Sequence, residues 1–313
     1  MSRLYDALKE ASRFRQDASG NAGEGVWEAL GINGVVAPLM ADDRKVGEVG
    51  TQITPDGEMS VISPELVVPA EEEVLPCVSA PLEGSFGTPT KTALDSRARL
   101  LPQAVAPVIV EHYRKLRTKI LQEQAKKPFK SVILTSASPQ EGKTVTVLNL
   151  GLSFAMLPSF KVLVVDGDLR RGTLGRCLGV DNDHAGLSNL IDGSSKLEDV
   201  VLRSDELPMH FIVRGNSKSP AAELLHSPLL GSYFREMAEQ FDMVLVDSPP
   251  VNLITDVQLL AGGCDAVLLI ARAFSTTRKA FEKAVQDLLP FRVIGTVLNA
   301  GEAQSSRRYN GYY

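Results

Sequence analysis

Hydrophobic residues follow two patterns that alternate along the chain from about residue 105 onward. Short apolar runs predict buried strands, and longer stretches with apolar residues every three or four positions predict helices. Such alternation produces βαβ units, whose strands run parallel beneath helices on both faces. We therefore predict an α/β fold with a doubly wound, mostly parallel sheet at 105–300. The expected elements are helix 108–126, strand 130–136, helix 143–156, strand 161–166, a helical region at 173–203, strand 210–214, helix 227–240, strand 242–247, helix 254–262, strand 265–271, helix 276–289 and strand 292–298.

The first hundred residues do not follow this alternation. Residues 1–16 predict a short amphipathic helix, because their apolar residues fall near one face. This helix either docks on a partner or on the folded domain, or it is a marginal solvated helix, since short helices need tertiary support. Residues 17–104 are acidic and rich in proline and glycine, so we predict a mostly disordered linker with short strands around 44–62.

Residues 131–144 have the pattern of a strand that turns directly into a helix, with Gly142, Lys143 and Thr144 at the helix start. This leaves free backbone N–H groups facing one point, which favours a phosphate. We expect Gly142 to allow close approach, Lys143 to reach the β and γ oxygens of a nucleotide, and the Thr144 hydroxyl to bind magnesium. The alternative is a Gly-Lys-Thr helix start without a ligand. The predicted nucleotide-binding residues of this loop are Ser138, Pro139, Gln140, Glu141, Gly142, Lys143, Thr144 and Val145.

Carboxylates follow two further predicted strands. One strand ends in Asp166-x-Asp168, and a later one ends in Asp247. In an open parallel sheet ligands bind at the carboxyl edge, so we expect these side chains to converge on the phosphate loop. Magnesium takes one or two carboxylates and keeps several waters. We therefore predict Thr144, Asp168 and Asp247 as metal ligands, although any one aspartate taken singly is equally well explained as a helix cap or a turn residue.

Composition narrows the possible functions. Hydrophobic residues make up 44% and charged residues 23%, as in a soluble enzyme. Residues 1–100 carry 9 Lys+Arg against 16 Asp+Glu, and residues 101–313 carry 24 against 22. Neither part of the chain has the excess of Lys and Arg that is typical of proteins that bind nucleic acid. The cysteines Cys77, Cys177 and Cys264 lack metal spacing, which fits a reducing compartment. No stretch reaches the roughly 18 to 20 apolar residues of a membrane span, so we expect a cytoplasmic protein.

Several motifs together resemble the bacterial tyrosine kinase (BY-kinase) family of polysaccharide export. PQEGKT, VVDGDLRR and FDMVLVDSPPV look like the Walker A, Walker A′ and Walker B motifs of that family. Upstream, EHYRKLRT resembles the family's subunit-association motif, with Glu111, Arg114 and Arg117 at the matching positions. The chain departs from the pattern at Ala137, where the first glycine is usual, and at Gln140, where the family more often has glycine.

The resemblance implies a P-loop NTPase domain that uses ATP and Mg²⁺ to phosphorylate protein tyrosines. The tail at 301–313 carries Tyr309, Tyr312 and Tyr313 and is similar to the autophosphorylated tyrosine cluster of these kinases. A flexible tail reaches a neighbour's active site more readily than its own. Phosphorylation in trans within a homo-oligomeric ring is therefore expected. The added negative charge would repel the tail from acidic neighbours, and the ring would then dissociate.

The same resemblance assigns roles to individual residues. Glu111 of one subunit would pair with Arg114 or Arg117 of the next, the alternative being an ordinary network on one helix surface. Asp166 is the candidate to orient or deprotonate the phenol, and orientation matters more because a carboxylate is a weak base for a phenol of pKa about 10. Arg170 is a candidate to steady the transferring charge.

Asn299 closes the last predicted strand. It is a candidate to hydrogen-bond adenine, and the alternative is a plain turn residue. Within the family the kinase is fused to a membrane-spanning chain or works beside a separate one. This chain resembles the second arrangement, which implies recruitment to the inner face of the membrane by a transmembrane polysaccharide co-polymerase or activator, and a role in regulating exopolysaccharide or capsule synthesis and export.

Two other functions stay open. One is a nucleotide-switched positioning ATPase of the same fold, although its usual second lysine is replaced here by Ser138. The other is a catalytically silent scaffold of an export complex. The presence of Lys143 together with Asp166, Asp168 and Asp247 argues against the scaffold.

Overall fold

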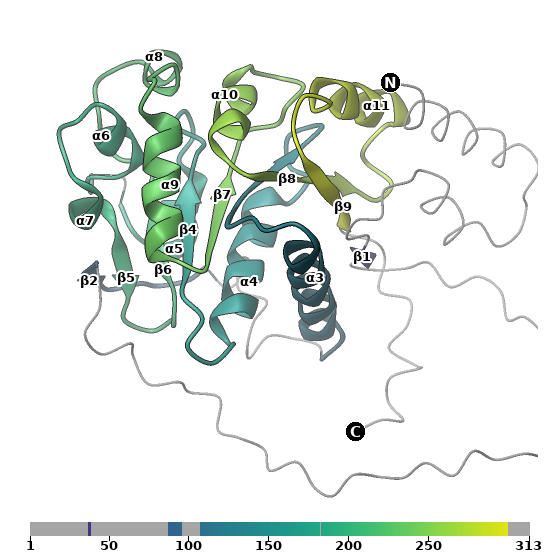
Figure 1. The fold of residues 1–313 in the computed structure, drawn as a ribbon, viewed down its shortest axis with the longest axis horizontal. Helices are drawn as coiled ribbons and strands as arrows, with labels where there is room; N and C mark the ends of the chain where they lie inside the picture. Colours follow the sequence, from purple (N-terminus) through teal and green to yellow (C-terminus); the bar gives the residue numbers. More distant parts are fainter. Residues whose placement is uncertain (1–36, 39–86, 96–106, 182, 300–313) are drawn as a thin grey trace, which may run out of the picture.

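The computed structural model describes residues 37–38, 87–95, 107–181 and 183–299 (Figure 1). The predicted helix at 1–16, the predicted strands around 44–62 and the tyrosine tail at 301–313 lie outside these residues. In the part of the chain that the structure describes, no helix has the length and apolar character needed to cross a membrane.

A mostly parallel sheet forms the centre of the described residues, with the strand order β1-β9-β8-β3-β7-β4-β6-β5-β2. Its central strands are β3 (Ser131–Ser136), β7 (Met243–Asp247) and β4 (Val162–Asp166), and each of their residues is buried. They pair in parallel with one another and with their neighbours β8 (Ala266–Arg272) and β6 (His210–Ile212). Strands buried on both faces need apolar residues at successive positions, which Val132–Leu134 of β3 and the first four residues of β4 and of β7 supply. The predicted fold class is confirmed.

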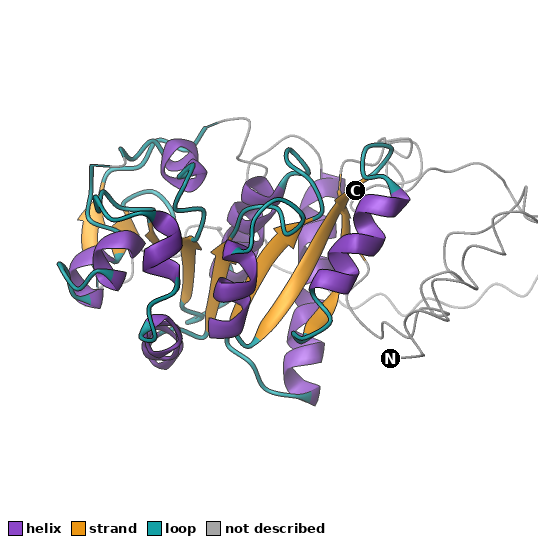
Figure 2. Cartoon of the chain, turned by 90° about the horizontal axis from the view of Figure 1, so that it is seen from above, coloured by secondary structure: helices purple, strands orange, loops and turns teal. Residues whose placement is uncertain are grey.

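Helices cover both faces of this sheet (Figures 1 and 2). One face carries α3 (Pro107–Lys126), α4 (Lys143–Ala155) and α5 (Thr173–Leu178). The other carries α9 (Leu230–Gln240), α10 (Asp256–Gly263) and α11 (Arg278–Asp287), together with the shorter helices α6, α7 and α8. The two layers follow from the alternation of strands and helices.

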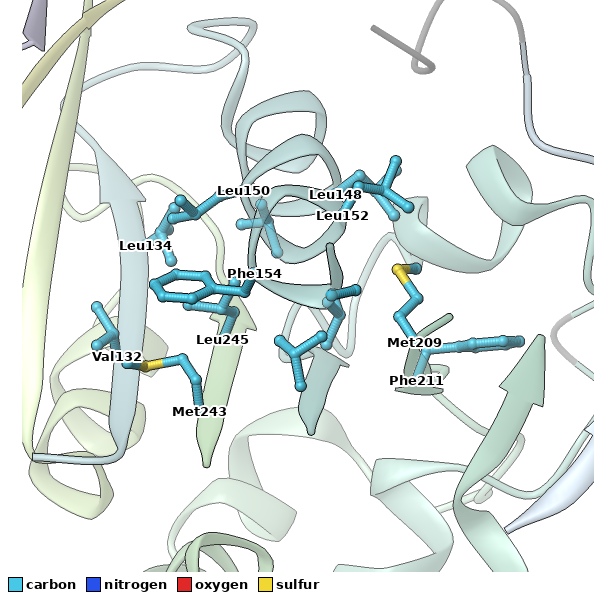
Figure 3. Packing of buried hydrophobic residues seen from close by; sticks show 14 of the residues in the cluster. Val132, Leu134, Leu148, Leu150, Leu152, Phe154, Met209, Phe211, Met243 and Leu245 are labelled. Atoms are coloured by element: carbon cyan, nitrogen blue, oxygen red, sulfur yellow. The ribbon is translucent and has the colours of Figure 1, made fainter. Parts of the chain in front are cut away.

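Successive residues of each central strand point into different cores. Leu134 of β3 and Leu245 of β7 pack with α4, whereas Ile133 of β3 packs in the core on the opposite face. Figure 3 shows Phe154 and Leu150 of α4 in the same cluster as the two leucines. Helix α4 is therefore fixed directly against the strand that leads into it.

The β5 edge of the sheet differs from the sequence prediction. In place of one helical region at 173–203, α5 is followed by α6 (Leu187–Ile191), α7 (Leu197–Val200) and the strand β5 (Leu202–Ser204), and β5 runs antiparallel to β6. A strand this short carries too few residues to show a period of two. Helix α8 (Ala221–Leu225), for which the sequence predicted no helix, precedes α9, and α9 (Leu230–Gln240) matches the helix expected at 227–240.

Residues 87–95, which the sequence assigned to the linker, lie along this edge. Strand β2 (Thr88–Thr90) pairs in parallel with β5, and the Thr92 hydroxyl lies 2.7 Å from the Ser204 hydroxyl. Pairing with an open sheet edge uses backbone groups, so no hydrophobic pattern marks the segment in the sequence. At the opposite edge β1 (Ala37–Pro38) pairs with β9 (Val293–Asn299).

The carboxyl ends of β3, β4 and β7 meet at one edge because these strands are parallel. Asp166 faces Asp247 in the register of β4 and β7, and Gly167 N donates to Asp247 O over 2.8 Å. The phosphate loop therefore lies beside both acidic strand ends.

Candidate nucleotide and metal site

The phosphate loop is the turn of residues 137–142 between β3 and α4. Gly142 has φ of 88° and Gln140 has φ of 60°, so both adopt the left-handed conformation. Helix α4 begins directly afterwards, at Lys143. The first turn of a helix offers backbone N–H groups and the positive end of the helix dipole. The loop therefore has the backbone of an anion-binding site.

Three side chains hold the loop from outside. Asn299 Nδ2 donates to Glu141 O over 3.0 Å, and Arg272 Nη1 donates to Gln140 O over 2.9 Å. Thr276 Oγ1 donates to Glu141 Oε1 over 2.6 Å, and the Glu141 side chain is buried. Asn299 thus contacts the phosphate loop itself, and its contact with adenine stays a prediction.

Lys143 lies at the inner side of the loop. Its Nζ donates to Ser136 Oγ over 3.0 Å. Burial lowers the pKa of Lys143, and the carboxylates of Asp247, Glu141 and Asp168 raise it in opposition. Three carboxylates therefore act on the amine electrostatically, as expected of a phosphate-binding lysine at a metal site.

Thr144 and Asp247 meet directly. Thr144 Oγ1 donates to Asp247 Oδ2 over 2.6 Å, whereas the buried Asp247 Oδ1 has no hydrogen-bond partner among the described residues. Burial raises the pKa of Asp247 to about 6, against the lowering effects of the Thr144 hydrogen bond and the Lys143 charge. A buried carboxylate with an unused oxygen beside a hydroxyl fits a hard divalent cation.

The oxygens of Thr144 and Asp247 fit magnesium, which needs few protein ligands. The described ranges contain no group of three or more His, Cys, Asp or Glu arranged to hold a metal ion. Magnesium takes few protein ligands and fills its shell with water and phosphate oxygens. The paired oxygens of Thr144 and Asp247 meet that requirement.

Asp166 and Asp168 are both buried, and backbone groups orient them. Asp166 accepts N–H bonds from Asp168 at 3.2 Å and from Leu174 at 2.9 Å, and its side chain is fully enclosed. Burial and the nearby Asp247 raise the pKa of Asp166 well above its usual range. The contact of Asp166 with a phenol stays a prediction, and in this conformation the carboxylate is closed off from solvent.

Arg170 forms an ion pair that the sequence did not predict. Its Nε donates to Asp256 Oδ2 over 2.8 Å, and its Nη2 donates to Asp256 Oδ1 over 3.1 Å. The side-chain hydrogen bond with Asp256 raises the pKa of Arg170. The predicted role of Arg170 in steadying transferred charge is untested.

The predicted oligomerisation residues lie on α3. Arg114 Nη1 is 3.9 Å from Glu111 Oε2 in the same chain, and Arg117 Nη1 donates to Ser153 O of α4. The Glu111–Arg114 contact is of the kind expected for a network on one helix surface, whereas Arg117 contacts another helix. The contact between subunits stays a prediction.

Sequence reasoning missed the supporting residues of the site, among them Ser136, Asp256, Arg272 and Thr276. Two of these could have been found. Arg272 is the last residue of β8 and Thr276 lies four residues after it. Because β8 neighbours β3 in the sheet, the strand-end rule places such residues beside the ligand.

Comparison with known proteins gives consistent matches. A family model described as an AAA domain matches residues 140–284. The chain is 32% identical over 205 residues to the tyrosine-protein kinase YwqD of Bacillus subtilis (strain 168). This match covers 65% of this chain and 85% of that protein. It is 28% identical over 207 residues to a putative tyrosine-protein kinase CapB of Staphylococcus aureus. That match covers 66% of this chain and 90% of that protein.

A solved structure extends the match to three dimensions. The kinase domain of the Escherichia coli tyrosine kinase ETK has a TM-score of 0.60 and 28% identity, and it covers 64% of this chain and 79% of that chain. The matched share corresponds in size to the sheet, its helices and the phosphate loop.

Proposed function

The chain belongs to the family of bacterial tyrosine-protein kinases, and on that premise we propose that it transfers the γ-phosphoryl group of ATP to tyrosine hydroxyls, including those of its own tail. In this reaction a bond forms between the phenolic oxygen and the γ phosphorus, the bond to the β-phosphate oxygen breaks, and ADP leaves. The phenolic proton passes to a carboxylate of the site or to water.

The observation that carries the proposal is the direct contact of Thr144 and Asp247 at the start of α4, with Lys143 beside them. Phosphoryl transfer is catalysed mainly by positioning and by neutralising charge, since the protein takes little covalent part. Lys143 and the N–H groups of the loop would hold β and γ oxygens.

Thr144, Asp168 and Asp247 would hold magnesium, directly or through water. When bound, this ion supplies the positive charge that neutralises the phosphate oxygens. Asp166 would orient the phenol once the site opens to admit it, and Asn299 would meet adenine at the rim of the phosphate loop.

The substrates are proposed to be Tyr309, Tyr312 and Tyr313 of a neighbouring subunit, together with other protein tyrosines. The support is compositional: Tyr309, Tyr312 and Tyr313 lie close together after a polar stretch of sequence that follows β9. Glu111, Arg114 and Arg117 would join subunits in a ring, because α3 carries Arg114 and part of Glu111 on its exposed side.

The cellular role is proposed from the family. We infer that the chain regulates synthesis and export of an exopolysaccharide or capsule, works in the cytoplasm and is recruited to the membrane by a transmembrane co-polymerase or activator. Co-purification of the chain with a membrane protein of that class, lost on removal of either partner, would support this. A chain that stays soluble in cells with an intact export system would contradict it.

The test of the activity is mass spectrometry for phosphotyrosine after incubation with ATP and MgCl₂, in the wild type, in Lys143→Met and in a chain with its tail tyrosines changed to phenylalanine. We expect tail phosphorylation in the wild type only, with the membrane partner present where it is required. Equal modification of the wild type and Lys143→Met would assign the reaction to another kinase. Hydrolysis of ATP without phosphotyrosine would favour a positioning ATPase.

A further inference from the structure

The turn that follows β4 carries one of the proposed metal carboxylates on a backbone support. Asp168 Oδ1 accepts N–H bonds from Arg170 at 3.3 Å and from Arg171 at 3.0 Å. The side chain of Asp168 is buried. Its orientation therefore depends on where the backbone of Arg170 and Arg171 lies.

Arg170 is itself fixed from another element. Its guanidinium forms a forked pair with Asp256, the first residue of α10, over 2.8 and 3.1 Å. The Asp256 side chain is 4% exposed and that of Arg170 is 46% exposed. A planar fork fixes direction as well as distance, so the pair ties the turn to α10.

Helix α10 continues the chain that leaves β7 after Asp247. The pair thus joins the two strand ends that carry Asp168 and Asp247. We propose that Arg170 is a positioning residue which, by pairing with Asp256, holds the Asp168 turn at the distance from Asp247 that a shared cation requires. This inference rests on the proposed function and names a role for Arg170 other than contact with the transferred phosphoryl group.

The two adjacent arginines differ in their surroundings. Two donors of Arg170 are taken by Asp256, which also balances its charge. Arg171 is exposed, and like Arg170 it donates a backbone N–H to Asp168. Replacing the Arg171 side chain removes a neighbouring positive charge and leaves the fork between Arg170 and Asp256 intact, so Arg171 serves as the comparator for Arg170.

The experiment uses the full chain and a fluorescent ADP analogue titrated with MgCl₂. ADP lacks the γ-phosphate, so an arginine that only contacts the transferred group has no effect on this binding. The variants are Arg170→Gln, Asp256→Asn and the double variant, with Arg171→Gln as the neighbouring comparator. Arg170→Lys keeps the charge and loses the fork. Thermal unfolding without nucleotide verifies that each variant is folded.

We expect Arg170→Gln and Asp256→Asn each to raise the Mg²⁺ concentration for half-maximal binding about tenfold, as for other residues that orient metal ligands. The double variant should show the same tenfold change rather than about a hundredfold, because the pair acts as one unit. Arg170→Lys should lie between the wild type and Arg170→Gln. Arg171→Gln should stay within about twofold, since it leaves the fork intact.

Other results would overturn the inference. An unchanged Mg²⁺ dependence in Asp256→Asn would show that the pair does not position Asp168. So would a double variant whose effect is the product of the single effects. A wild-type chain that binds the magnesium–ADP analogue but makes no phosphotyrosine would overturn the proposed function instead, and the binding comparison would still be decided.

Discussion

The phosphate loop and the turn after β4 that carries Asp168, here called the acidic turn, lie at the same edge of the sheet but are held by different kinds of contact. The phosphate loop is positioned by its own backbone and by Asn299 and Arg272, which donate to its carbonyl oxygens. The acidic turn is positioned by ionised groups, with Arg170 paired to Asp256. Asn299, Arg272 and Asp256 are all distant in sequence from the segment that they hold.

This difference predicts two kinds of sensitivity. A site built from backbone shape tolerates changes of pH but fails when its space is filled. A site built from buried charge tolerates some change of shape but depends on protonation and on each partner being present. The following substitutions separate the two.

The largest effect is expected from Gly142→Ala. Gly142 has φ of 88°, and a Cβ there would overlap with the Asn299 amide. A left-handed alanine costs about 1–2 kcal/mol and overpacking costs about 1–3 kcal/mol more. We expect a loss of about 3 kcal/mol in the free energy of unfolding and at least a tenfold loss in nucleotide affinity, measured by chemical unfolding and by titration.

Gly193→Ala is the matched control. Gly193 has φ of 77° and nothing lies within 4 Å of an added Cβ. It should lose only the left-handed cost of about 1–2 kcal/mol and keep its nucleotide affinity. If both variants bound nucleotide equally well, the phosphate loop would not depend on the space at Gly142.

The next effect concerns charge. The pKa of Asp247 rises from 3.8 to about 6 on folding. Its stabilising contribution is therefore complete below about pH 4 and is lost as pH rises through about 6, which corresponds to about 3 kcal/mol. Without nucleotide, Asp247→Asn should match the wild type near pH 4 and be more stable by up to about 3 kcal/mol at pH 7.5.

Unfolding curves at the two pH values test this, and magnesium-dependent binding in the same variant should fall because the ionised carboxylate is gone. A constant stability difference between the two pH values would mean that Asp247 titrates normally. Magnesium-dependent binding is measured in Asp168→Asn as well, because Asp168 is also a proposed metal ligand at this edge of the sheet.

A smaller loss is expected from Thr276→Val. The Thr276 hydroxyl donates to Glu141 Oε1, and the buried Oε2 has no hydrogen-bond partner within the described residues. Removing the donor leaves the buried carboxylate less satisfied, which costs about 1–3 kcal/mol. Thr118→Val removes an exposed hydroxyl that donates to Arg114 O, and it should change the unfolding free energy by less than about 0.5 kcal/mol. Equal losses in the two variants would exclude a special role for the Glu141 contact.

The smallest effect is a gain from Gln140→Gly. Gln140 has φ of 60°, where glycine is free of the side-chain penalty. The added flexibility of the unfolded chain offsets part of the benefit, so we expect about 0.5–1 kcal/mol of added stability. Ser159, with φ of 58° in a turn away from the site, should give a similar gain on change to glycine. A loss at Gln140 alone would show that its side chain contributes to the loop.

Much of the fold could be predicted because burial on both faces leaves its pattern in the chain. The strands β3, β4 and β7 each contain a run of three or four successive apolar residues, and each lies where its pattern placed it. Strand β5 and the pairing of residues 87–95 with it left no such pattern, because short edge strands are held by backbone hydrogen bonds. The strand-end rule brought Asp166 and Asp247 together correctly, since parallel strands share a carboxyl edge.

By itself the sequence determined the layers of the fold, the phosphate loop and the acidic strand ends, because periodicity and strand-to-helix turns are local properties of a chain. Only the tertiary structure decided which partners these residues have. Arg170 meets Asp256 from 86 residues away, and Asn299 meets Glu141 from 158 residues away. Contacts over such separations depend on how strands order themselves in the sheet, and no local pattern encodes that order.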